Sequence, residues 1–136
     1  KKIVLPQHTD HAGVMWHGAY VSWIEEIRVE TLNSVGLNYF DLSSSGYEFP
    51  VVSLNIDYKK PLLHGDEVIV ETIDISRKGA RIIWKSNFLK AGKFISAESS
   101  VELVLVRKTG KGFLLIKNMP DFILKGLEKI TNAQLN

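Results

Sequence analysis

The sequence predicts an α+β domain in which one early helix lies against a mostly antiparallel sheet. Apolar residues recur every three or four positions over residues 20–35, as they do on one face of a helix. Between residues 51 and 106 they alternate with polar residues, and short turns separate the alternating segments. The chain has 136 residues, of which 45% are apolar and 24% charged. We therefore expect one globular domain over residues 1–136.

Composition argues against several classes of protein. The net charge of +2 is too small to indicate binding to nucleic acid or to a membrane surface. No apolar run approaches the ~20 residues of a membrane span, and no signal peptide stands out. The absence of cysteine excludes a thiolate nucleophile, a disulfide framework and a zinc–cysteine site. We expect a cytoplasmic protein without a bound metal.

The first half of the chain contains the predicted central helix. Lys2–Leu5 is a short strand candidate, and the helix is predicted over Tyr20–Val35 with Gly36 as its C-cap. Its inward face is expected to carry His17, Tyr20, Ile24, Ile27, Thr31 and Val35, whereas the charged residues, including Glu25 and Arg28, lie mostly elsewhere. Leu37–Pro50 is expected to be irregular.

The second half predicts an antiparallel meander followed by a helix. The expected strands are Val51–Lys59, Val68–Ile75, Arg81–Leu89, Phe94–Val106 and Phe113–Ile116. A turn is expected at Ser76–Gly79, and Ile95, Ala97, Val101, Leu103 and Leu105 should share one face of their strand. Pro120 should open a helix whose apolar face carries Phe122, Ile123, Leu127 and Ile130. A single curved sheet leaves an open edge, so we expect pairing with a second copy as a homodimer or homotetramer.

The segment that precedes the predicted central helix carries the chemistry. His8–Tyr20 holds three of the four histidines, one carboxylate, two glycines, a tryptophan and a tyrosine. A polar, glycine-containing segment that leads into a helix places reactive side chains beside unpaired backbone N–H groups.

Asp10, Gly13, His17 and Tyr20 have the spacing D-x-x-G-x-x-x-H-x-x-Y. This run resembles the signature of acyl-CoA thioesterases in the 4-hydroxybenzoyl-CoA thioesterase superfamily. The likeness extends over residues 2 to 107, and includes Trp23-Ile24-Glu25, Arg28, Tyr58-Lys59-Lys60-Pro61 and Gly65-Asp66-Glu67-Val68. The resemblance implies the hotdog fold, in which a curved antiparallel sheet wraps around a central helix.

The same resemblance implies hydrolysis of an acyl- or aroyl-CoA to the free acid and coenzyme A. Coenzyme A is then part of the substrate, and no retained cofactor is expected. In this family the nucleotide usually lies along a subunit interface, so the site would need the dimer.

The resemblance makes Asp10 the catalytic carboxylate, either as nucleophile or as general base. Backbone N–H groups near Ala19 and Tyr20, at the start of the helix, would stabilise the oxyanion. Gly13 would let the chain turn closely against the substrate, and His17 would orient the carbonyl, the water or the leaving group.

Other residues are expected to bind the substrate. Val14, Trp16, Tyr20 and Glu25 are candidates for the walls of the pocket. Lys59, Lys60, Arg77 and Lys78 are candidates for the phosphates of coenzyme A, because basic side chains near exposed turns bind phosphate. The sequence does not distinguish an aromatic from an aliphatic acyl group.

Several alternatives stay open on the sequence alone. Asp10 could cap the turn before the helix, and His17 could be a packed side chain. A metal site from His8, Asp10, His11 and His17 is disfavoured, because side chains of an extended segment alternate and no H-x-x-x-H pairing exists. His17 with Glu25 could supply the acid–base pair of a hotdog hydratase or dehydratase. A non-catalytic acyl-CoA-binding module is the remaining alternative.

Overall fold

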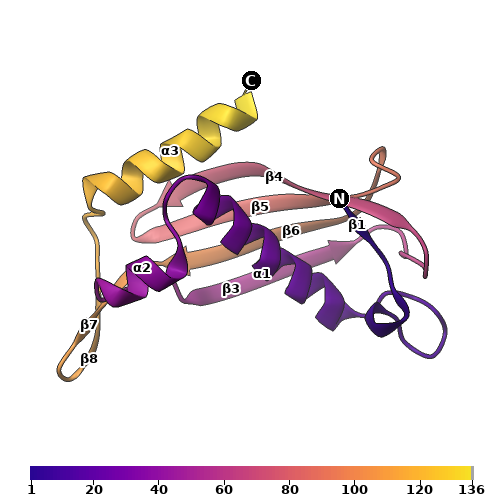
Figure 1. The fold of residues 1–136 in the computed structure, drawn as a ribbon, viewed down its shortest axis with the longest axis horizontal. Helices are drawn as coiled ribbons and strands as arrows, with labels where there is room; N and C mark the ends of the chain where they lie inside the picture. The colour runs from indigo at the N-terminus through magenta and orange to yellow at the C-terminus, as the bar shows by residue number, and fades with distance from the viewer. Residues whose placement is uncertain (136) are drawn as a thin grey trace.

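The structure, a computed structural model, describes residues 1–135 and consists of a curved antiparallel sheet with a long helix along its concave side (Figure 1). The five-stranded sheet has the order β1-β4-β5-β6-β3, and a smaller sheet has the order β2-β7-β8. The strands are β1 (Lys2–Ile3), β2 (Tyr47–Glu48), β3 (Val51–Tyr58), β4 (Glu67–Lys78), β5 (Arg81–Lys90), β6 (Phe94–Val104), β7 (Val106–Thr109) and β8 (Gly112–Leu115). The helices are α1 (His17–Ser34), α2 (Tyr39–Ser44), α3 (Asp121–Leu135) and a 3-10 turn at Pro6–His8. The predicted α+β architecture, with one helix wrapped by an antiparallel sheet, is confirmed.

The core lies between α1 and the concave side of the sheet. Alternate residues of β5, among them Ile82, Trp84 and Phe88, are buried there, as the period-two pattern predicts. Tyr20 and Ile24 of α1 are buried as expected. Further along α1, Ile27 and Val35 are partly buried and pack against the core, so the predicted face is confirmed in part. The most deeply buried positions there are Arg28 and Leu32, which the prediction did not include. A charged residue does not register in apolar periodicity, so the pattern could not indicate that Arg28 is buried.

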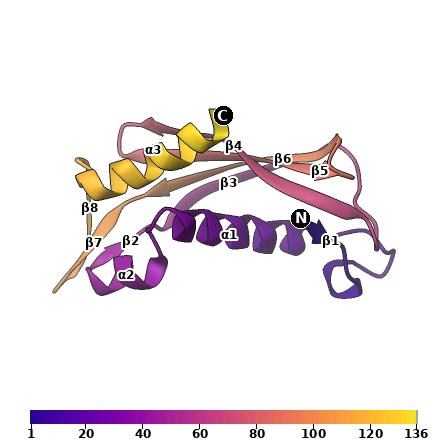
Figure 2. The same cartoon turned by 45° about the horizontal axis from the view of Figure 1, so that its top comes forward.

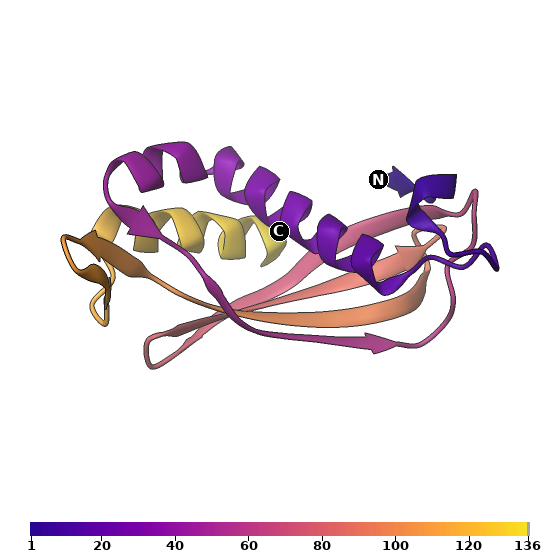
Figure 3. The same ribbon diagram turned by 90° about the horizontal axis from the view of Figure 1, so that it is seen from below.

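The C-terminal helix α3 runs beside β4 (Figure 2) and covers the same side of the sheet as α1 (Figure 3). Ile123, Leu127 and Ile130 are buried, which confirms most of the predicted apolar face. Phe122 is the exception, because it is half-exposed and packs edge-on against Tyr47, with the ring centroids 6.2 Å apart.

Residues 37–50 are not irregular, contrary to the prediction. They contain α2 and β2. Asn38 caps α2 by accepting a hydrogen bond from the amide of Asp41 (2.8 Å), and Leu42 is buried against the core. A six-residue helix is too short to be stable alone, so this cap and this burial fix it, and neither appears as a periodicity in the sequence.

Two strand predictions also need correction. β4 continues to Lys78, so the reversal occurs at Gly79–Ala80 and not over Ser76–Gly79; Gly79 has a φ of +61°, which a tight reversal needs. Ile95 is exposed, although it was expected to share the buried face of Ala97. The register between β5 and β6 shifts next to Ile95, which turns the side chain away from the core.

The edge strand β3 differs from the central strands of its sheet. Leu54, Ile56 and Tyr58 pair with Val101, Ser99 and Ala97, which are all buried, so these three β3 residues face the helix side. Nevertheless Leu54 is 41% and Tyr58 52% exposed. Within the described chain, β3 therefore has an apolar row that is only partly covered. No helix among residues 1–135 is long and apolar enough to cross a membrane.

Candidate active site

The segment that carries Asp10 forms a tight turn before α1. The amide of Asp10 donates to the carbonyl of Val14 (2.9 Å), and Gly13 donates to the carbonyl of Asp10 (3.0 Å). The Asp10 Oδ1 accepts hydrogen bonds from the amides of Ala12 (2.9 Å) and Val14 (3.2 Å). Gly13 has a φ of +80°, which confirms the predicted need for glycine. Oδ1 therefore has the turn-capping role that the sequence left open, and the side chain is exposed in the single chain.

Backbone hydrogen bonds fasten this turn to the connection between β3 and β4. The buried Met15 donates to the carbonyl of Leu62 (2.7 Å), and His64 donates to the carbonyl of Gly13 (3.2 Å). His8 is also committed to structure, because its Nδ1 accepts from the amide of Leu5 (3.0 Å) and its ring packs edge-on against Trp23. The turn is thus held on both sides, and Asp10 has a fixed backbone position.

The start of α1 lies three residues earlier than predicted. The helix begins at His17, and the amide of Ala19 donates to the carbonyl of Trp16 (3.0 Å). The prediction that Ala19 offers an unpaired N–H group is therefore wrong. Trp16 is the N-cap and makes no side-chain capping hydrogen bond. Within residues 1–135 no acceptor is found for the amides of His17 and Gly18, so these two are the free donors of the first turn.

The Trp16 indole covers the backbone at Gly18. A Cβ atom on Gly18 would lie 2.3 Å from the ring, so no larger residue fits there unless the indole moves. The rings of Trp16 and His17 meet edge-on with their centroids 5.2 Å apart, and both side chains are exposed. Trp16 and His17 thus form the helix start, which was predicted only at Tyr20. The exposed His17 does not lie on the inward face, contrary to the prediction, because it occupies the first position of the helix.

A cavity of about 290 Å³ opens between the helix start and the C-terminal end of β3. It is lined by Val14, Met15, Tyr20, Tyr58, Lys59, Lys60 and Pro61. Tyr20 is buried between Tyr58 and Phe88, and its ring centroid lies 5.0 Å from each. Burial, together with Tyr58, raises the pKa of Tyr20 to about 12, so its hydroxyl stays protonated at neutral pH. Asp10 does not line this cavity in the single chain.

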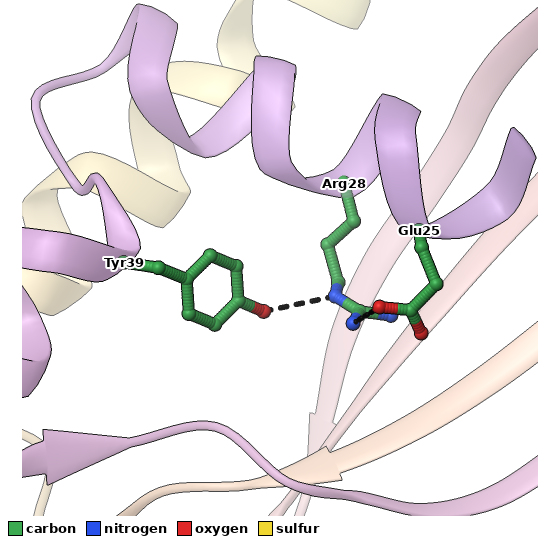
Figure 4. A network of polar contacts seen from close by, with 3 residues as sticks. All are labelled: Glu25, Arg28 and Tyr39. Atoms are coloured by element: carbon green, nitrogen blue, oxygen red, sulfur yellow. Dashed lines mark hydrogen bonds and ion pairs between the residues drawn. The ribbon is translucent and has the colours of Figure 1, made fainter. Parts of the chain in front are cut away.

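Glu25 and Arg28 form a separate polar network on the side of α1 (Figure 4). Arg28 is 5% exposed; its Nε donates to the Tyr39 hydroxyl (2.9 Å) and its Nη2 to the Glu25 carboxylate (2.6 Å). Burial alone would lower the pKa of Arg28, but Tyr39 and Glu25 raise it above its ordinary value. Nη1 is buried without a partner among the described residues. The sequence analysis missed this buried arginine, and its only signal was the E-x-x-R spacing that the resemblance contained.

The predicted site residues thus fall into three groups. Val14, Tyr20, Lys59 and Lys60 line the cavity, and Trp16 and His17 form the helix start beside it. Asp10 and Gly13 lie in the turn that precedes the helix and do not line the cavity. Glu25 contacts Arg28 and does not line the cavity. Arg77 and Lys78 pair with Ile82 and Arg81 at the β4–β5 reversal, whereas Tyr58 pairs with Ala97 near the start of β6. These two basic pairs lie at opposite ends of the sheet, so one chain does not bring them together.

The model of the Thioesterase superfamily matches residues 12–92. This range includes Gly13 to Tyr20, the whole of α1 and strands β3 to β5. The chain belongs to the Thioesterase superfamily.

Individual relatives agree with this membership. A Synechocystis protein named as an esterase is 36% identical over 86 residues, which are 63% of this chain and 52% of that protein, so the match spans about half of its length. The Escherichia coli acyl-CoA thioester hydrolase YbgC is 25% identical over 100 residues, or 74% of this chain and 75% of that protein. Among solved structures, a 1,4-dihydroxy-2-naphthoyl-CoA thioesterase of Synechocystis has a TM-score of 0.81 at 20% identity and covers 96% of this chain and 94% of its own. The fold of this superfamily member is the hotdog fold.

Proposed function

We propose that this superfamily member hydrolyses an acyl-CoA thioester to the free acid and coenzyme A. The observation that supports the proposal is that a turn with a fixed carboxylate directly precedes a helix start without a side-chain cap. Oδ1 of Asp10 is held by two amides, and Oδ2 has no hydrogen-bond partner within residues 1–135. The first turn of α1 offers the amides of His17 and Gly18. The name of the E. coli relative gives the same reaction.

The proposed reaction assigns one role to each part. Asp10 Oδ2 either attacks the thioester carbonyl or takes a proton from the attacking water. The free amides of the helix start donate to the oxyanion that forms, and the positive end of the helix dipole adds to the stabilisation. The C–S bond then breaks, and coenzyme A leaves as a thiolate that takes up a proton. When Asp10 acts as base this step gives the free acid; when Asp10 attacks, water then hydrolyses the acyl–Asp10 anhydride and releases the acid. Lys59 and Lys60 line the cavity and would contact the phosphates of coenzyme A.

The proposal includes a homodimer in which the β3 edges of two copies pair. An edge strand has unpaired backbone N–H and C=O groups, and its apolar row adds a driving force for pairing. Asp10 is exposed in the single chain, so a second copy would also enclose the site. A cytoplasmic location and a single domain over residues 1–136 remain predictions.

The structure gives less support to the hydratase alternative. That reaction would need His17 and Glu25 to act on the same carbon atom. The Glu25 carboxylate is instead bound to Arg28 on the side of α1, whereas the His17 ring lies against Trp16 at the helix start.

Replacement of Asp10 by Asn tests the proposal. An amide oxygen can still accept the Ala12 and Val14 hydrogen bonds, so the turn should persist, but Asn can neither attack nor take a proton. We expect thiol release from an acyl-CoA panel to fall by roughly a hundredfold or more, while substrate binding measured by calorimetry is retained. Asp74→Asn, an exposed carboxylate on β4, is the matched control and should keep full activity. Retained activity in Asp10→Asn would assign the chemistry to another residue.

A further inference from the structure

A second, apolar groove lies at the opposite end of β3 from the helix start. It has a volume of about 390 Å³ and is lined by Glu48, Phe49, Pro50, Val106 and Phe113. Phe113 is 65% exposed and forms one wall. The Glu48 carboxylate accepts a hydrogen bond from Ser43 (2.7 Å) and pairs with Lys108 (3.1 Å), and these contacts hold its pKa below the ordinary value. Its charge is thus satisfied by neighbours, and the rest of the lining is apolar.

We propose that this groove receives the far end of a linear fatty acyl chain whose thioester is bound at the helix start of a second copy. The inference rests on the proposed function and extends it by naming the substrate class and the source of the acyl pocket. The volume of the groove is within the range of small-molecule sites, roughly 300–1,000 Å³.

Within one chain the groove and the helix start are too far apart to share a substrate end to end. The helix start lies over the C-terminal end of β3, where Tyr20 contacts Tyr58. Pro50, which lines the groove, directly precedes the first residue of β3. Eight residues of strand separate the two places, which corresponds to roughly 26 Å at about 3.3 Å per residue.

Two-fold pairing of the β3 edges removes this separation. In an antiparallel pair, directly opposite residues have their side chains on the same face of the sheet. Side chains alternate between faces along β3, so an even-numbered residue of one copy lies opposite an even-numbered residue of the other, and an odd-numbered residue opposite an odd-numbered one. The two such registers with the greatest overlap are centred on Leu54 or on Asn55. They place the partner's Tyr58 opposite Pro50 or opposite Val52. Because paired strands lie about 4.8 Å apart, the partner's cavity then lies beside the groove.

Both cavities also open on the same side of the sheet. Tyr58 faces the helix side, since it contacts Tyr20 and pairs with the buried Ala97. Glu48 in the groove is bonded to Ser43 of α2, which follows α1 along the same side of the sheet (Figure 3). Joined end to end, the two cavities form an elongated path whose far end, at Phe49 and Phe113 of the partner's groove, is apolar. A linear acyl chain of medium length fits such a path better than a compact aromatic ring.

Phe113→Asp tests the groove, and Phe40→Asp is its matched control. Both phenylalanines are exposed, at 65% and 80%, and only Phe113 lines the groove. Each methylene buried raises kcat/KM by roughly fourfold, or about 0.8 kcal/mol. We therefore expect Phe113→Asp to lower kcat/KM for octanoyl-CoA at least tenfold while acetyl-CoA hydrolysis stays within twofold. Phe40→Asp should change neither. An unchanged chain-length profile in Phe113→Asp would overturn the inference.

Mixed dimers test whether the groove acts across the interface. Asp10→Asn and Phe113→Asp chains carry different affinity tags, are co-expressed, and are isolated as mixed dimers. One of the two sites then combines an intact Asp10 with an intact groove from the other chain. We expect about half of the wild-type octanoyl-CoA activity, whereas a groove that serves its own chain would give no more than about a twentieth.

A measurement of octanoyl-CoA binding separates the test of the groove from the test of the proposed function. If the wild type hydrolyses no acyl-CoA, including acetyl-CoA, the proposed function fails. The groove is then tested by calorimetry with octanoyl-CoA, whose affinity should fall at least tenfold in Phe113→Asp and remain unchanged in Phe40→Asp. Equal affinities in these two variants would overturn the inference independently of turnover.

Discussion

Strands β5 and β3 belong to one sheet and have the same alternating pattern, but they differ in what covers them. In β5 the inward residues Ile82, Trp84 and Phe88 are all buried. In β3 the residues that face the same side, Leu54 and Tyr58, are about half-exposed. The difference follows from position, because β5 lies between β4 and β6, whereas β3 is the edge strand.

This comparison separates two kinds of information in a sequence pattern. Alternation indicates which side of a sheet a residue faces, and it does so correctly in both strands. It does not indicate whether the covering residues come from the same chain. The neighbours of Tyr20 illustrate this difference. Its ring contacts Phe88 of β5 and Tyr58 of β3 at the same centroid distance, but Phe88 is fully buried whereas Tyr58 is 52% exposed.

The largest effect on stability is expected from a substitution in the buried strand β5. Phe88→Ala removes a fully buried ring from the core and should lower the free energy of unfolding by about 3–5 kcal/mol. Leu54→Ala in β3, measured at the same low protein concentration, should cost less than about 1 kcal/mol. Urea unfolding followed by circular dichroism measures both values. Equal costs would show that a single chain already covers β3 as completely as β5.

Much of the fold could be predicted because its signals are local. The alternation in residues 81–89 gave β5 nearly to its observed ends, and Gly13 was correctly assigned a positive φ from its place in a turn. The helix α2 was not predicted, although its cap joins Asn38 and Asp41, which are only three residues apart. Six residues are too few for an apolar periodicity, and the burial of Leu42 depends on residues far apart in the sequence.

The candidate site shows the same division. The motif indicated the segment that leads into α1, with Asp10 in a turn before the helix and His17 and Tyr20 in its first turns, but it did not give the residue at which the helix begins. The first residue of the helix decides which backbone amides have no acceptor. These amides were expected near Ala19 and Tyr20, and in the structure they are those of His17 and Gly18. The buried Arg28 was not predicted either, because burial of a guanidinium depends on partners such as Tyr39.

A smaller effect is expected from the titration of Tyr20. Its pKa is about 12 in the folded chain and 10.0 for an unperturbed tyrosine, so the unfolded chain loses this proton first as pH rises. The contribution of Tyr20 to the free energy of unfolding is therefore fully present below pH 10, and it falls by about 2–3 kcal/mol between pH 10 and 12. Tyr20→Phe should remove this part of the slope in urea titrations at each pH. Tyr58→Phe should retain most of it, because burial is the main cause of the shift. If the pH dependence of stability disappears in Tyr58→Phe instead, the raised pKa of Tyr20 is caused by Tyr58 of β3 and not by burial.

The smallest effect on folding, and the most informative one for β3, is expected from Leu54→Asp. Leu54 is 41% exposed in the single chain, so a charge there should cost little in a dilute, monomeric sample. In a two-fold pair, however, the row to which Leu54 belongs would be buried against its copy, and an unpaired buried charge is strongly unfavourable. We expect light scattering over a concentration series to give twice the chain mass for the wild type and a single chain mass for Leu54→Asp. Ile73→Asp, at a similarly exposed isoleucine of β4, is the control and should keep the dimer. If the wild type stays monomeric at high concentration, or if Leu54→Asp still forms a dimer, then the apolar row of β3 is exposed for a reason other than the absence of a second copy.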